Sequence, residues 1–78
     1  MDVIEGIYRI VATPMLSTAS PDPATPWQAR VDVYRGQDSK PIVSLVPSGW
    51  FANSRSAEVV ALNFGSYAAR TLPHHGTE

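Results

Sequence analysis

Residues 27–35 carry the clearest pattern in the chain, a strict alternation of two kinds of side chain. One set of alternate positions is apolar: Trp27, Ala29, Val31 and Val33. The positions between them are polar or amphipathic: Gln28, Arg30, Asp32 and Tyr34. Because side chains point alternately to the two faces of a strand, this segment predicts a strand with one buried and one wetter face. Strands of this kind are typical of antiparallel sheets.

A first strand is predicted over residues 4–12, which are rich in β-branched and aromatic side chains. Its two faces would carry Tyr8, Ile10 and Ala12 on one side and Ile7, Arg9 and Val11 on the other. The former set is more apolar and is expected to face the core.

A third strand is predicted over residues 41–46, after the turn-forming residues 36–40. Pro41 opens it, since proline is tolerated at the first position of a strand. We expect this strand to form a hairpin with residues 27–35. The pattern leaves open which of its faces is inward.

Small residues recur at every fourth position in the last third of the chain. They are Ala57, Ala61, Gly65 and Ala69. On an α-helix this spacing forms one ridge, which predicts a helix that lies close to the surface it covers. Asn53 or Ser54 is the expected N-cap, and the helix should end near Thr71 or Leu72 because Pro73 prevents its continuation.

Residues 13–26 separate the first two predicted strands and contain four prolines, Pro14, Pro21, Pro23 and Pro26. Proline has no backbone N–H, so this segment is predicted to be neither a helix nor a central strand. We expect a long exposed loop here and a flexible tail over residues 73–78.

These elements predict one domain over residues 1–78, of the α+β class. Its architecture would be a three-stranded antiparallel sheet with one C-terminal helix packed on one face. The expected core consists of Tyr8, Ile10, Trp27, Ala29, Val31, Val33, Leu45, Phe51, Ala57, Val60, Ala61, Phe64 and Ala68.

Composition narrows the functional classes. The chain has no cysteine and a net charge of -1, with six scattered basic residues, which is no electrostatic footprint for nucleic acid. Asp2 and Glu5 lie where a signal peptide would need positive charge, and apolar runs are short, so we expect a cytoplasmic protein that does not enter membranes. A domain of this size buries only about 60% of its unfolded surface, which favours a homodimer.

No arrangement of side chains indicates catalysis, a cofactor or a metal site. His74 and His75 are adjacent, and adjacent side chains on an extended chain point in opposite directions, so they chelate one metal poorly. Among the carboxylates inside predicted elements, Asp32 shares its face with Arg30, which predicts an ion pair, and Glu58 lies near the start of the helix. We therefore expect a non-enzymatic protein without a cofactor.

The sheet face that the helix leaves uncovered is the candidate interaction surface. It would carry Ile7, Arg9, Val11, Arg30, Asp32 and Tyr34. Tyr and Arg are enriched among the residues that carry binding energy at interfaces. We expect a protein-interaction module that self-associates through this face or a strand edge, or that binds a small protein partner. The alternative is nucleic-acid binding through Arg9, Arg30 and Tyr34, with bases stacked on the tyrosine ring.

The strand-to-helix junction at residues 50–61 resembles a family pattern. Trp50 and Phe51 precede Asn53, Ser54 and an alanine-rich first turn that includes Glu58. This is similar to small bacterial βββα domains, in which a Phe precedes a Thr or Ser cap. A more distant likeness is to the HicB-like antitoxin fold, whose sheet-plus-helix unit binds a small toxin. The resemblance implies the βββα architecture and an antitoxin-like regulatory alternative, and it supplies no catalytic residue.

Overall fold

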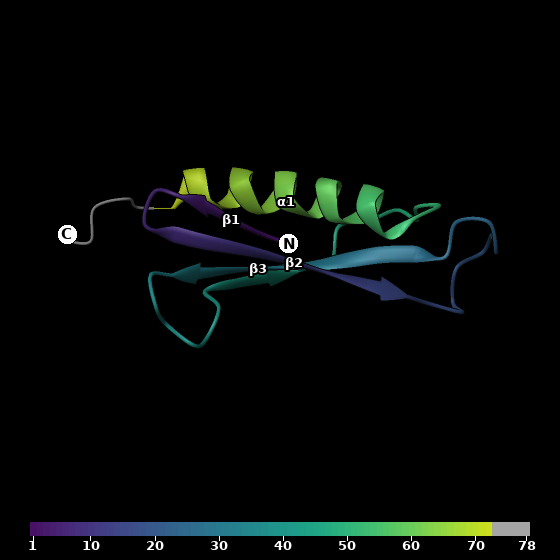
Figure 1. Cartoon of the computed structure of the whole chain (residues 1–78), viewed down its shortest axis with the longest axis horizontal. Coiled ribbons are helices and arrows are strands. Elements are labelled where there is room, and N and C mark those ends of the chain that lie inside the picture. The colour runs from purple at the N-terminus through teal and green to yellow at the C-terminus, as the bar shows by residue number, and fades with distance from the viewer. Residues whose placement is uncertain (73–78) are drawn as a thin grey trace.

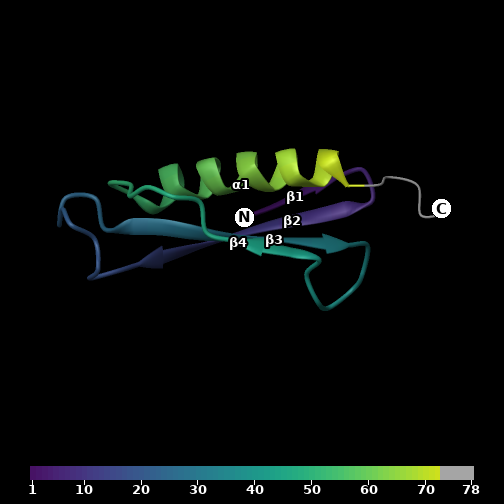
Figure 2. The ribbon, with the colours of Figure 1, turned by 180° about the vertical axis from the view of Figure 1, so that it is seen from behind.

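A computed structural model describes residues 1–72 and shows an antiparallel sheet of four strands covered on one face by a helix (Figure 1). In chain order the elements are β1 (Asp2–Glu5), β2 (Tyr8–Leu16), β3 (Trp27–Arg35), β4 (Val43–Leu45) and α1 (Ser54–Thr71). The sheet order is β1-β2-β3-β4, so each strand pairs with its neighbour in the chain. Figure 2 shows the same two layers from behind, with β4 beside β3. The α+β class and the C-terminal helix are confirmed, whereas the prediction of three strands is wrong.

The extra strand arises because the predicted strand over residues 4–12 contains a tight turn. Gly6 and Ile7 form this turn, and Gly6 has a φ of 62°, which glycine adopts without steric cost. Type II′ hairpin turns place a glycine at this first central position. The segment before the turn folds back as β1 and pairs antiparallel with β2, from Glu5 opposite Tyr8 to Asp2 opposite Val11.

β2 also runs further than predicted, through Pro14 to Leu16, so the loop between β2 and β3 covers residues 17–26 rather than 13–26. The N–H of Ala12 points toward β1 and donates to the carbonyl of Met1 at 2.9 Å. Backbone direction alternates along a strand, so the nitrogen of Pro14 points the same way, beyond the end of β1. The missing N–H of Pro14 therefore costs no bond to a neighbouring strand.

The prediction for β3 is confirmed with its bounds, and so is its hairpin with the following strand. β4 is shorter than residues 41–46, and its register settles which face is inward. Val43 lies opposite Val33 and Leu45 opposite Val31, so both share the face that α1 covers. Ser44 lies opposite Asp32 on the other face.

α1 begins and ends as the sequence predicts. The side chain of Asn53 is the N-cap and accepts a hydrogen bond from the backbone N–H of Ser56 at 2.8 Å. Leu72 is the C-cap. Two ion pairs fasten the helix to the first residues of the chain: Glu58 lies 3.7 Å from the amino group of Met1, and Arg70 lies 3.7 Å from Glu5.

The ridge of small residues faces the sheet, where it lies over β2 and β3. All four members, Ala57, Ala61, Gly65 and Ala69, are buried. The rest of the buried apolar core is Tyr8, Ile10, Ala12, Ala29, Val31, Val33 and Leu62. The expected core omitted Ala12, Leu62 and Ala69, whereas Trp27, Leu45, Phe51, Val60 and Ala68 are partly buried.

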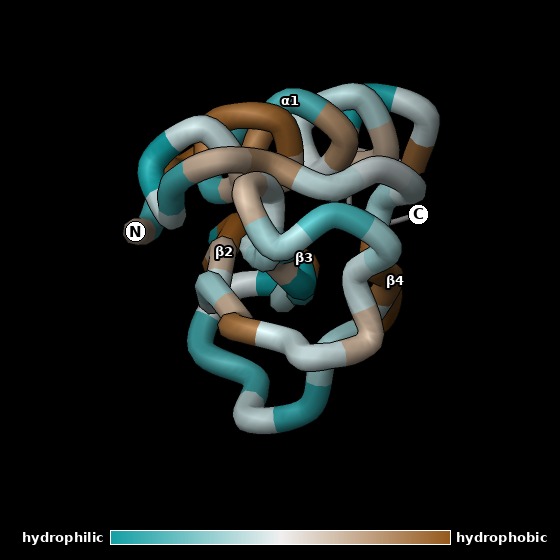
Figure 3. Tube along the Cα trace, turned by 90° about the vertical axis from the view of Figure 1, so that its right-hand side faces the viewer, coloured by the Kyte–Doolittle hydropathy of each residue, from teal (hydrophilic) through white to brown (hydrophobic). Residues whose placement is uncertain are grey.

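Phe64 is a correction to the predicted core, because its side chain is 49% exposed. It precedes Gly65 by one residue, and one residue on a helix is a rotation of about 100°. With Gly65 aimed at the sheet, Phe64 is therefore turned to the flank of α1. Figure 3 shows α1 over one face of the sheet, and in the described part of the chain no helix covers the other face.

Candidate functional site

The sheet face opposite α1 gathers five of the six residues predicted to form an interaction surface. The register of β2 and β3 places Arg9 opposite Tyr34 and Val11 opposite Asp32, with Arg30 opposite Thr13. We call Arg9, Val11, Arg30, Asp32 and Tyr34, together with Ser44 of β4, the open sheet face. These residues come from three adjacent strands, so they form one continuous surface.

Ile7 does not belong to a strand of this surface, contrary to the prediction. It lies in the turn between β1 and β2, where its carbonyl accepts a hydrogen bond from the N–H of Gly36 at 2.9 Å. β1 instead contributes Ile4, which lies opposite Arg9 and is 67% exposed, and Asp2, which lies opposite Val11. Sequence reasoning missed Ile4 because it did not separate β1 from β2 at Gly6.

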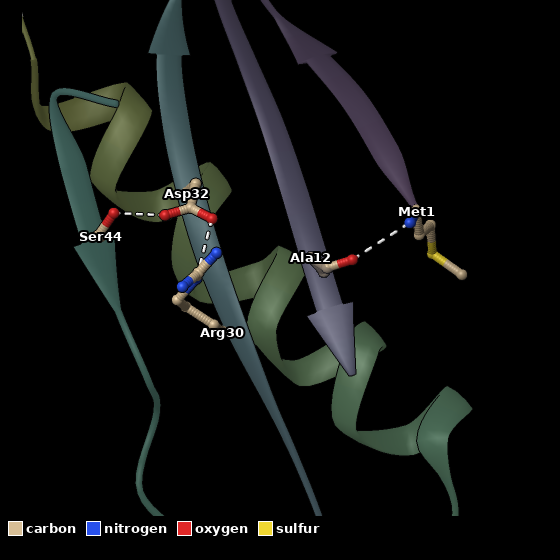
Figure 4. Close-up of polar contacts among 5 residues, drawn as sticks. All are labelled: Met1, Ala12, Arg30, Asp32 and Ser44. Atoms are coloured by element: carbon tan, nitrogen blue, oxygen red, sulfur yellow. Dashed lines mark hydrogen bonds and ion pairs between the residues drawn. The ribbon is translucent and has the colours of Figure 1, made fainter. Parts of the chain in front are cut away.

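Asp32 is the centre of a polar network on the open sheet face (Figure 4). Nε of Arg30 donates to Oδ2 of Asp32 at 3.1 Å, which confirms the predicted ion pair. The hydroxyl of Ser44 donates to the other carboxylate oxygen, Oδ1. The Asp32 residue is only 3% exposed, although no helix within residues 1–72 covers this face. The two donors satisfy a carboxylate that would be costly to bury alone.

A second contact on the same face joins β2 to β3. The guanidinium carbon of Arg9 lies 4.4 Å from the centre of the Tyr34 ring, within the range of a cation–π interaction. The arginine therefore covers one face of the ring. A base cannot stack on that face unless Arg9 moves, and Arg30 is already paired with Asp32. Three residues were expected to hold nucleic acid. Arg9 and Tyr34 are thus in contact with each other, and Arg30 is paired with Asp32.

In the part of the chain from residue 1 to residue 72, no group of three or more His, Cys, Asp or Glu side chains is placed to hold a metal ion. Glu58 pairs with the amino group of Met1. His74 and His75, and the expected tail over residues 73–78, lie outside the described residues. Over the same described part, no helix has the length and apolar character needed to span a bilayer.

Comparisons of the chain with protein-family models, with curated proteins and with solved structures found no match. The likeness to bacterial βββα domains and to the HicB-like fold therefore rests on the residues of the strand-to-helix junction. In the structure these residues form the Asn53 cap and the first turn of α1, after four strands rather than three.

Proposed function

We propose that this chain is a non-enzymatic protein-interaction module that binds its partner through the open sheet face. The observation that carries this proposal is the buried, fully paired carboxylate of Asp32. A partner that covers the face leaves no unpaired charge at its centre, because Arg30 and Ser44 already satisfy both carboxylate oxygens. Desolvation of this network is therefore less costly than desolvation of free charges.

The side chains around Asp32 have the composition of a binding surface. Tyr and Arg are the residue types most enriched at energetic centres of interfaces, and Tyr34, Arg9 and Arg30 stand beside Val11 on this face. Arg9 is held against the Tyr34 ring, so part of its rotamer entropy is already lost before binding. The exposed Ile4 extends the apolar part of the surface onto β1.

The face supports binding better than the edges of the sheet do. β4 has three residues and is bordered closely by Pro41 and Pro47, which have no N–H to offer to an added strand. β1 has only four residues. The partner is a small protein or a second copy of this chain, because a net charge of -1 does not attract a polyanion.

A matched pair of variants tests this proposal. Arg9→Ala removes one positive charge from the open sheet face, and Lys40→Ala removes one from the exposed turn between β3 and β4. The tagged full chain is used to capture partners from nuclease-treated lysate of its native cell, and captured proteins are then titrated directly. We expect Arg9→Ala to weaken binding about tenfold or more, and Lys40→Ala to leave it unchanged. Equal losses would indicate non-specific charge attraction, and no loss with a folded Arg9→Ala variant would overturn the proposal.

A further inference from the structure

The outward side of α1 carries no charged side chain between Ser56 and Tyr67, and Arg70 follows at its C-terminal end. The exposed or half-exposed residues of this stretch are Ser56, Val59, Val60, Asn63 and Tyr67, with Phe64 at the flank, and we call them the outer face of α1. Tyr67 is 66% exposed and Phe64 is 49% exposed. Between Arg55 and Arg70 the only charged side chain is Glu58, and it pairs with the amino group of Met1. Large exposed aromatic side chains on an uncharged helix surface indicate an interface.

This face carries a large exposed aromatic ring and a surface hollow. Asn53, Arg55, Ser56, Val59 and Val60 line a surface hollow of about 440 Å³ at the N-terminal half of the helix. Tyr67, in the C-terminal half, is largely exposed and lines a second hollow with Asn63 and Phe64. Positions 56, 60, 63 and 67 follow one another at intervals of four, three and four, so they share one side of the helix. Tyr67 lies seven residues after Val60, which is about 10 Å along the helix axis.

We infer that a second copy of this chain docks on the outer face of α1, with the two helices antiparallel about a twofold axis near Asn63. Reversal of the helix direction brings the Tyr67 of each copy over the hollow of the other, so both contacts form at once. The side chain of Asn63 has both a donor and an acceptor, and can therefore pair with its own copy at the axis. Arg55 lines the rim of the hollow, so in the dimer its guanidinium meets the face of the Tyr67 ring of the other copy, a favourable contact for a cation.

The size of this surface predicts a weak dimer. Aromatic side chains cover about 150–250 Å² each, so the exposed parts of Phe64 and Tyr67 from two copies supply roughly 400–500 Å². The lower end of specific interfaces is about 1,000 Å² of buried surface. The remaining area has to come from Val59, Val60 and the other residues that line the hollow. We therefore expect a dissociation constant in the micromolar range. This inference does not rest on the proposed function, because the two surfaces lie on opposite layers of the fold, and the dimer leaves both open sheet faces free.

Sedimentation equilibrium of the full chain tests the dimer. Tyr67→Ala should weaken dimerisation about tenfold or more, because each dimer loses two inserted rings. Leu16→Ala is the control, since it removes a similarly exposed apolar side chain from the end of β2, outside both surfaces, and it should leave the dimer unchanged. Tyr34→Ala reports separately on the open sheet face. A monomer at high micromolar concentration would overturn the inference. So would a dimer that depends on Tyr34 and not on Tyr67, and that outcome would support self-association through the open sheet face instead.

A third variant separates dimerisation from folding. Ser56 is the third residue of the helix, where Glu or Gln favours the capping arrangement and where negative charge complements the helix dipole. Ser56→Glu also puts bulk and charge into the hollow. We expect it to keep or raise the melting temperature of the monomer while weakening the dimer about tenfold. A variant that dimerises like the wild type would show that the hollow is not the binding site.

The absence of cysteine from the chain allows a geometric test. Under mild oxidation, Asn63→Cys should form a disulfide-linked dimer, because the twofold axis brings the two copies of this position together. Lys40→Cys, in the exposed turn, should not do so at the same protein concentration. Equal cross-linking of the two variants would contradict the antiparallel arrangement.

Discussion

Gly65 of α1 lies directly against Ile10 of β2. A methyl group added at Gly65 would lie 2.5 Å from Cγ2 of Ile10 and 2.6 Å from Cγ2 of Val31. Both neighbours are fully buried. The close approach of helix and sheet is therefore set by the absence of a side chain at one position.

Gly65→Ala tests this contact, because two effects of the substitution oppose each other. Alanine is favoured over glycine in a helix by about 1 kcal/mol, whereas overpacking a filled core costs about 1–3 kcal/mol. We expect the cost of the overlap with Ile10 and Val31 to exceed the gain in helix propensity, so that the net free energy of unfolding falls. In a domain of this size each 1 kcal/mol lowers the melting temperature by about 4–8 °C. Ser66→Ala on the same helix is the control, and a raised melting temperature for Gly65→Ala would show that helix and sheet can separate freely.

The hydroxyl of Ser44 is expected to stabilise the fold through Asp32. Ser44→Ala removes one of the two donors to a buried carboxylate, and an unsatisfied buried acceptor costs about 1–3 kcal/mol. The midpoint of urea unfolding should therefore fall. Ser44→Thr keeps the hydroxyl and should restore most of the loss, while Ser39→Ala in the exposed turn should have no effect. A Ser44→Ala variant as stable as the wild type would show that water replaces the missing donor.

Gly6 is expected to fix the turn between β1 and β2. Its φ of 62° is unfavourable for residues with a side chain, so Gly6→Ala should destabilise the fold by about 1–2 kcal/mol. Gly6→Asn should cost less, because asparagine tolerates this conformation better. Thermal unfolding of the two variants checks this order. If alanine is tolerated as well as asparagine, the turn does not require a positive φ.

The sequence predicted those parts of the fold in which one pattern determines both the element and its facing. The alternation of β3 and the small-residue ridge of α1 did so, and both are confirmed. The separation of β1 from β2 was not predicted, because a single glycine within a run of β-branched residues is the only sign of the two-residue turn. Pro14 is accommodated in β2 because its nitrogen lies on the side of β1, whose pairing with β2 reaches no further than Val11.

The candidate site was predictable to the same degree. Arg30 and Asp32 lie two residues apart on one strand, so their pairing followed from strand geometry alone. Ser44 was not predicted as the second partner, because the apolar residues Ile42, Val43, Leu45 and Val46 do not determine which face of this strand is inward. Phe64 was assigned to the core because it lies alongside the small-residue ridge, but its position beside the ridge leaves it 49% exposed on the flank of α1.

The sequential order of the strands also bears on how the chain folds. Each hairpin joins neighbours in the chain, through a two-residue turn between β1 and β2 and through residues 17–26 between β2 and β3. Short-range contacts of this kind form with little loss of loop entropy, whereas α1 must close back over β2 and β1 from the far end of the chain. We therefore expect the meander to assemble first and the docking of the helix to complete the domain. During synthesis the apolar face of the sheet would then stay uncovered until α1, in the last third of the chain, has left the ribosome.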